Sequence, residues 1–514
     1  MSRMVWMAFY DLKGQLRERG TFLIVVSVLV LACFGLHQGK QLAGASVEAT
    51  AAATAQQASA LARAKAYTAQ FFADPTKPEN ASAKSYKNPA DIRGYAFREY
   101  LAFAVKPALP GAALAIGQSD VLPAYVRVKV ESMDSARTHY EIEHPARLAS
   151  GRFDLSFVAL YLWPLALLTL CLSALTHDRE TMRIKTLAIE GVSPLKIVVT
   201  QVAARALAAS VFFAFIMALL ALISGAVPMN AEGFSVVGQW CAVTLAYSAF
   251  WAGVCVLIGA SCHSRATAAF AAFGAWLIVA VLLPNVIAAA VTSVAPVPSR
   301  EAYIVAARDA ADAVNSDRQN MVARFYDQHP EWRLEKTAID KISPTVTRLA
   351  RAIELEEKLA QVDAKFISAK RKQLSLIDRA SVFSPVNLAQ HALASIAGND
   401  LARHERFMSA VRSHQLKLRE FMQGELQRAA KRDETAPCPN TCVAGFGFTA
   451  HDRVPTFVAS ADLQTSTNVG TEPFWLVLWA ALLSFAAAWI LRSHRVSRAL
   501  NALAATGKSH AATT

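Results

Sequence analysis

The sequence is poor in charged residues. Of its 514 residues only 18% are Asp, Glu, Lys or Arg, whereas 54% are hydrophobic, and a soluble domain usually carries about 25% charged residues. The shortage is concentrated in six apolar runs that contain almost no charge. Most of these runs are long enough to cross the ~30 Å hydrocarbon core of a bilayer as helices. The composition therefore predicts a polytopic membrane protein.

The sequence also lacks the common motifs of catalysis and nucleotide binding. It has no Gly-x-x-x-x-Gly-Lys-Ser/Thr loop, no His-Glu-x-x-His and no Gly-x-Ser-x-Gly. No basic stripe interleaved with aromatic residues points to nucleic acid. We therefore expect no enzyme activity, no cofactor, no metal and no nucleic-acid partner for this chain. If ATP drives the protein, another polypeptide binds it.

Ionisable residues are nearly absent from the interiors of the apolar runs, where ion-coupled transporters place their binding sites. The exception is Arg205, about two turns into one run. Its long side chain is expected to reach back to the lipid head groups.

The pattern predicts a mainly α fold with six transmembrane helices and two extracytoplasmic regions, the first mixed α/β and the second mostly helical. In chain order we expect an interfacial helix at 1–20, spans at 21–39, 154–176, 197–223, 235–262, 266–295 and 473–491, outer regions at 40–153 and 296–472, a surface helix at 177–196 and a tail at 492–514.

The Lys and Arg residues close to span ends fall on one side of this arrangement, and the loop 224–234 on the other side has none. By the positive-inside rule both termini are then cytoplasmic and both large regions lie outside. The interfacial helix carries cations that would face anionic membrane lipid.

Periodicity predicts further elements inside the outer regions. Residues 40–73 are expected to continue the first span as a helix that ends at Asp74-Pro75, and Tyr125–Val130 alternates as a strand does. Helices are expected at roughly 300–328, 345–382, 386–397 and 401–432. Pro164 and Pro284 are candidate kinks of the second and fifth spans.

Two of the seven cysteines share a polar stretch, Cys438-Pro-Asn-Thr-Cys442. If this stretch faces an oxidising compartment, a local disulfide between Cys438 and Cys442 is expected. A copper or haem site is the weaker alternative, because no Cys-x-x-Cys-His motif and no His or Met cluster accompanies the pair.

A short charged segment follows the second span and ends at Gly191-Val-Ser-Pro194. It is either an interfacial connector or a coupling helix that docks into a cytoplasmic ATPase. For the second interpretation the candidate ATPase-coupling residues are Arg179, Glu180, Arg183, Ile184, Leu187, Gly191 and Pro194.

This layout resembles the permease subunit of ABC type-2 exporters, which has an elbow helix, six spans and a coupling helix between the second and third spans. Two motifs resemble those of an uncharacterised subfamily with two large periplasmic insertions. The first includes Gly151, Phe153, Asp154 and Pro164; the second runs through Phe383-Ser384-Pro385, Gly398-Asn399-Asp400, His404 and Phe407. Thr181-Met182-Arg183 stands where the family usually has a glycine.

The resemblance implies a bacterial inner-membrane protein in which two permease copies, identical or different, join ABC ATP-binding subunits that hold ATP and Mg. The complex would move or extract an amphipathic, lipid-like or small-molecule substrate. The alternative is a mechanical or signalling protein whose outer regions regulate a periplasmic partner without transport.

Overall fold

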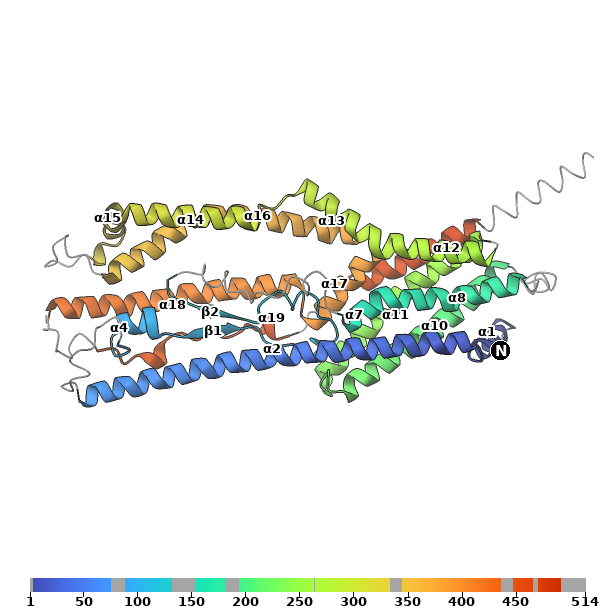
Figure 1. The fold of residues 1–514 in the computed structure, drawn as a ribbon, viewed down its shortest axis with the longest axis horizontal. Helices are drawn as coiled ribbons and strands as arrows, with labels where there is room; N and C mark the ends of the chain where they lie inside the picture. Colours follow the sequence, from blue (N-terminus) through green and yellow to red (C-terminus); the bar gives the residue numbers. More distant parts are fainter. Residues whose placement is uncertain are drawn as a thin grey trace, which may run out of the picture.

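The computed structural model describes residues 3–74, 88–131, 153–180, 194–262, 264–332, 344–435, 447–465 and 470–490. The molecule is elongated, with its apolar helices gathered at one end and polar helices with a small sheet at the other (Figure 1). Six helices are long and apolar enough to cross a membrane. The prediction of a mainly α protein with six candidate spans is confirmed. We call the two ends the span bundle and the polar region.

One helix, α2 (Arg19–Ala73), runs through both parts. Its 55 residues extend about 82 Å at 1.5 Å per residue. The helix ends at Ala73 with Asp74 as its C-cap, because the residue before a proline is disfavoured in helical conformation. The predicted continuation of the first span through residue 73 is therefore confirmed. A short helix, α1 (Arg3–Gln15), lies at the membrane-span end of α2 (Figure 1).

The other candidate spans form the rest of the bundle, and the two that follow α2 in the chain contact it. They are formed by α7 (Leu155–Phe157), η3 (Val158–Leu162) and α8 (Trp163–Glu180); α10 (Pro194–Ile223); α11 (Ala231–Ser261); α12 (Arg265–Trp276), η4 (Leu277–Leu282) and α13 (Leu283–Val294); and Glu472–Ile490. Aromatic side chains pack against one another in the interior of the span bundle. Trp163 stacks on Phe213 with ring centroids 4.4 Å apart and its indole N–H donates to Ser248 at 2.9 Å.

Both candidate kinks coincide with π-helical turns. The π-helical segment η3 ends just before Trp163-Pro164, and η4 ends just before Leu283-Pro284. Proline lacks an N–H and clashes with the carbonyl four residues earlier, and a wider turn relieves both problems. The two prolines therefore locally rewind their spans without breaking them.

The first part of the polar region contains α4 (Ile92–Gly94), η2 (Tyr95–Glu99), β1 (Ala102–Val105) and β2 (Tyr125–Val128). The two strands are antiparallel, with Ala102 opposite Val128. The predicted strand is present as β2. Its partner β1 is not predicted by the sequence pattern, because four residues that end at Lys106-Pro107 give too short an alternation.

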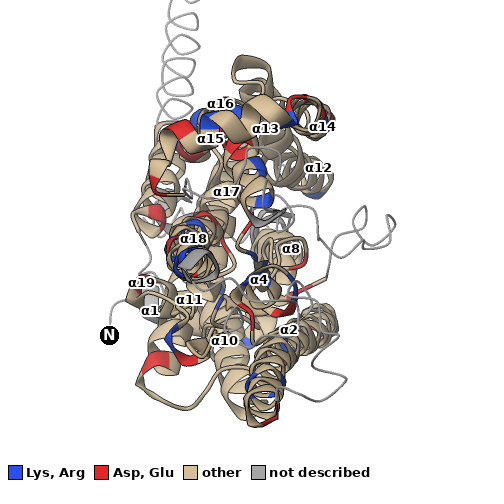
Figure 2. Ribbon diagram, turned by 90° about the vertical axis from the view of Figure 1, so that its left-hand side faces the viewer, with Lys and Arg blue, Asp and Glu red and all other residues tan. Residues whose placement is uncertain are grey.

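The second part consists of α14 (Arg300–Ser316), α15 (Arg318–Gln328), η5 (Pro330–Trp332), α16 (Pro344–Ser381), α17 (Pro385–Ala397), α18 (Leu401–Thr435), η7 (His451–Arg453) and α19 (Ala461–Gln464). The four predicted helical stretches are present, the first of them divided at Asp317. Viewed along the long axis, α14 and α16 lie on one side, α18 in the middle and α2 on the opposite side (Figure 2). A second hydrophobic core joins these layers; it includes Phe325, Trp332, Leu349, Phe407, Leu418 and Met422.

Candidate functional site at the junction of the two parts

Residues 107–118, which we call the junction loop, lie where the span bundle meets the polar region. Two prolines and two glycines keep this segment out of helix and strand, and Gly117 has a φ of 55°. The loop is nevertheless well buried: Leu109, Ala113, Leu114, Ala115 and Ile116 are all at most 5% exposed. Its backbone groups must therefore find partners within the protein.

Asp154 supplies one of these partners from the start of the second candidate span. Its carboxylate accepts a hydrogen bond from the N–H of Ile116 at 2.8 Å and, as the N-cap of α7, another from the N–H of Phe157 at 2.6 Å. Ser156 adds a bond to the carbonyl of Leu114 at 3.1 Å. The junction loop is thus fixed to the first turn of the span.

Asn399 and Arg403 hold the same loop from the polar region. Gly398 ends α17 in the left-handed conformation, with a φ of 69°. The next residue, Asn399, donates to the carbonyls of Ala112 and Ala115 at 3.2 and 2.6 Å. The Arg403 guanidinium donates to the carbonyl of Pro107 at 2.6 Å.

Arg403 also ties in two further segments of the polar region. Its guanidinium reaches the carbonyls of Gly398 at 2.9 Å and Leu463 at 2.5 Å, and the residue is 3% exposed. Burial lowers the pKa of Arg403 to about 10. One side chain therefore joins the loop, the α17–α18 turn and α19. The two motifs identified in the sequence, far apart along the chain, meet on one backbone segment.

Two glycines of α2 complete the junction by close backbone approach. A Cβ on Gly35 would lie 2.7 Å from the carbonyl carbon of Asp154, and one on Gly39 would lie 2.1 Å from the carbonyl oxygen of Ala113. Neither position has room for a side chain. Phe153, also from the first motif, packs its ring against Phe34 of α2 and Phe157, with centroids 5.7 and 5.2 Å apart.

A buried charged cluster lies beside the junction. Burial, with a contribution from Arg403, lowers the pKa of Lys106 to about 8, and burial followed by Lys106 lowers the pKa of His404 to about 4. Asp400 caps α18 by accepting from the N–H of Arg403 at 3.1 Å. Within the described ranges, no group of three or more His, Cys, Asp and Glu could hold a metal. The hydrogen bonds of the junction go to backbone atoms, so the arrangement is suited to joining segments mechanically.

A second polar contact lies at the opposite end of the bundle. Arg205 of α10 forms a two-pronged ion pair with Asp11 of α1, with Nε–Oδ2 and Nη2–Oδ1 distances of 2.6 and 2.8 Å. It also donates to the carbonyl of Leu170 in α8 at 3.1 Å, and Gln15 of α1 approaches that carbonyl at 3.4 Å. The ion pair and the two hydrogen bonds to Leu170, which we call the Arg205 contact, join α1, α8 and α10.

The prediction that Arg205 reaches out to lipid head groups is wrong, because its side chain is only 5% exposed and is paired with Asp11. A signal was present in the sequence. Asp11 and Gln15 are four residues apart and so share one face of α1. That face turns inward, whereas Phe9 and Leu16 are 55% and 81% exposed. Sequence reasoning also missed Gly35, Gly39 and the junction loop.

The predicted ATPase-coupling residues are only partly described. Arg179 and Glu180 form the end of α8, so the span helix continues through the start of the segment assigned to a separate surface helix at 177–196. Pro194 begins α10, a position that suits proline. Arg183, Ile184, Leu187 and Gly191 lie outside the described residues, as do Gly151, Cys438 and Cys442. The coupling helix and the disulfide stay predictions.

Comparison with protein-family models gives a match to part of the chain. A protein-family model described as "Domain of unknown function (DUF3526)" matches residues 300–436. This range runs from α14 to α18 and contains Asn399 and Arg403. No curated protein and no solved structure matches the chain.

Proposed function

We propose that the chain is the transmembrane permease subunit of an ATP-driven ABC exporter that moves or extracts an amphipathic, lipid-like or small-molecule substrate. In this proposal a separate subunit binds ATP and Mg, a second permease copy completes the complex, both termini face the bacterial cytoplasm, and the polar region lies in the periplasm. The observation that carries the proposal is the continuous helix from Leu155 to Glu180, which connects the junction with segment 181–193.

This helix is built to transmit displacement. From Leu155 to Glu180 it extends about 39 Å. Its described core is mostly buried among other helices, so it cannot bend freely. Asp154 fixes one end to the junction loop, and Leu170, ten residues before the other end, is held by the Arg205 contact. The π-helical turn η3 is the one described place in this helix where a change of winding could absorb movement.

Movement of this helix would reach the polar region through the junction loop. The loop is bound on one side by Asp154 and on the other by Asn399 and Arg403, which belong to the turn that starts α18. The close approach of Gly39 adds α2, which continues to the far end of the polar region. Packed interfaces of this kind tend to have two arrangements and to convert small shifts into rigid-body movement.

Co-purification from the native host tests the proposal. A tagged full-length chain should bring down an ATP-binding subunit together with ATPase activity. Recovery of the folded chain without any ATPase would contradict the proposal.

A second candidate is ATP-driven signalling without transport. It is favoured by the size of the polar region, where α16 and α18 form long helices of 38 and 35 residues. In reconstituted liposomes, ATPase stimulation by small amphipathic compounds would favour export. Stimulation only by a periplasmic protein would favour signalling.

A further inference from the structure

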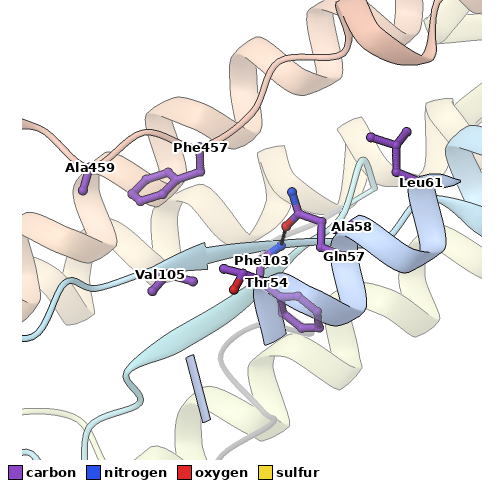
Figure 3. A pocket seen from close by; sticks show the side chains of 8 residues that line it. All are labelled: Thr54, Gln57, Ala58, Leu61, Phe103, Val105, Phe457 and Ala459. Atoms are coloured by element: carbon purple, nitrogen blue, oxygen red, sulfur yellow. Dashed lines mark hydrogen bonds between the residues drawn. The ribbon is translucent and has the colours of Figure 1, made fainter. Parts of the chain in front are cut away.

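A pocket of about 290 Å³ opens in the polar region between α2, β1 and the segment that follows η7 (Figure 3). Ligand pockets usually measure about 300–1,000 Å³, so this one fits a single alkyl chain better than a large molecule. Ala58 and Leu61 of α2, Phe103 and Val105 of β1, and Phe457 form its apolar walls.

The polar side chains in the pocket wall are already engaged with the protein. Gln57 accepts a hydrogen bond from the N–H of Phe103 at 2.8 Å, drawn in Figure 3. Thr54 donates to the carbonyl of Ala51 at 2.8 Å within its own helix. An alkyl chain could therefore enter this pocket without breaking either of these two hydrogen bonds.

Phe457, one of the residues that line the pocket, also contacts a buried histidine that has an unpartnered ring nitrogen. The Phe457 ring touches Phe407 and His414 edge-on, with centroids 5.9 and 5.6 Å apart. His414 is 8% exposed, and its Nε2 has no hydrogen-bond partner among the described residues. A buried polar atom without a partner lowers folding stability. Burial also lowers the pKa of His414, so the ring is neutral at neutral pH.

We propose that this pocket binds the alkyl chain of a single-chain amphiphile with an uncharged hydrogen-bonding head group, and that rotation of the Phe457 ring lets the head group reach Nε2 of His414. A neutral head group fits because a charged one would lose far more hydration on entering this interior. Neutral histidine can donate or accept at Nε2, depending on its tautomer. The inference concerns binding alone and goes beyond the proposed function, because it does not require that the ligand be transported.

Photocrosslinking of the full-length protein in nanodiscs tests the inference. The probe is 1-dodecanol with a diazirine near its chain end, and adducts are mapped by mass spectrometry. We expect adducts within residues 54–61, 103–105 or 457–459. Unlabelled 1-dodecanol should compete roughly fivefold better than dodecane or dodecanoate, because only the alcohol combines a neutral head with a chain. Adducts confined to the spans would overturn the proposal.

Two matched variants test where the alkyl chain of the ligand binds. Ala58→Trp fills the pocket from its rim, whereas Ala52→Trp places the same side chain at an exposed position of α2 that does not line the pocket. Labelling at the pocket should fall about tenfold in the first variant, the change expected when an alkyl chain loses its site, and stay unchanged in the second. Equal labelling of wild type and Ala58→Trp would overturn the site.

A third variant tests the head group. His414→Leu removes the unpartnered nitrogen and should keep the labelling while abolishing the preference for alcohol over alkane. An unchanged preference would overturn the role of His414. Thermal unfolding of each variant shows whether the protein is folded during the assay.

Discussion

Gly39 offers the sharpest test of the junction. A methyl group at this position would lie 2.1 Å from the carbonyl oxygen and 3.1 Å from the carbonyl carbon of Ala113. Both contacts are with backbone, so no side-chain rotation can relieve them. Gly39→Ala should therefore push the junction loop away from α2 and weaken the hydrogen bonds that it makes with Asp154 and Asn399.

The magnitude follows from two opposing effects. Alanine is favoured over glycine in a helix by about 0.5–1 kcal/mol, whereas overpacking costs about 1–3 kcal/mol, and the backbone contact places Gly39→Ala in the upper part of that range. Gly44 is the matched control, because it lies in the same helix and a methyl group added there would meet nothing within 4 Å. Gly44→Ala should have the helix-propensity gain alone.

The difference between the two variants isolates the clash, since both share the gain in propensity. Thermal unfolding of the purified proteins in nanodiscs should show Gly39→Ala less stable than Gly44→Ala by about 2–3 kcal/mol. If the two variants unfold at the same temperature, the loop does not pack against α2 as described.

Three further predictions concern charged groups. Asp11→Asn leaves the Arg205 cation buried without its charged partner and should cost about 3–5 kcal/mol of stability. In thermal unfolding, adding Arg205→Asp to Asp11→Arg should recover part of the stability that Asp11→Arg alone loses. A double variant no more stable than Asp11→Arg would argue against the Arg205 contact. A hydrogen bond from His391 to Glu472, 3.0 Å long, raises the pKa of His391, so the pair stabilises the fold below the ordinary histidine pKa of about 6.5 and loses this effect as pH rises through the raised value. His391→Gln should therefore destabilise the protein more at about pH 6 than at about pH 9, and equal losses at both would refute the pairing. Burial lowers the pKa of Lys106 from 10.5 to about 8. Between these two values the unfolded chain binds more protons than the folded protein, so stability should rise with pH across that window. Lys106→Met should remove this rise, and a rise that persists in the variant would show that another group causes it.

Much of the fold follows from local patterns. The helices α16, α17 and α18 begin and end within a few residues of their predicted limits, because amphipathic periodicity and the flanking prolines are local signals. The strand β1 escapes prediction because its alternation is only four residues long. It is defined by its pairing with β2, which lies beyond an intervening loop.

The candidate site depends on contacts that local patterns do not encode. The environment of Arg205 is mispredicted because its partner, Asp11, lies 194 positions away in the sequence, and a single apolar run gives no information about a helix that packs against it. Motif resemblance does single out Asp154 and Asn399. It cannot show that both bind the junction loop, since that loop has no periodicity and its role emerges only when the two parts of the chain are brought together.

The most direct test of the central claim is the ATPase rate of the co-purified complex in nanodiscs. Glu180 is the last described residue of the helix that runs from the junction toward segment 181–193, whereas Glu48 is an exposed acidic residue of α2 in the polar region. The account predicts that Glu180→Ala lowers the ATPase rate several-fold and that Glu48→Ala leaves it unchanged. Equal rates in wild type and both variants would contradict the claim that this helix couples the protein to an ATPase.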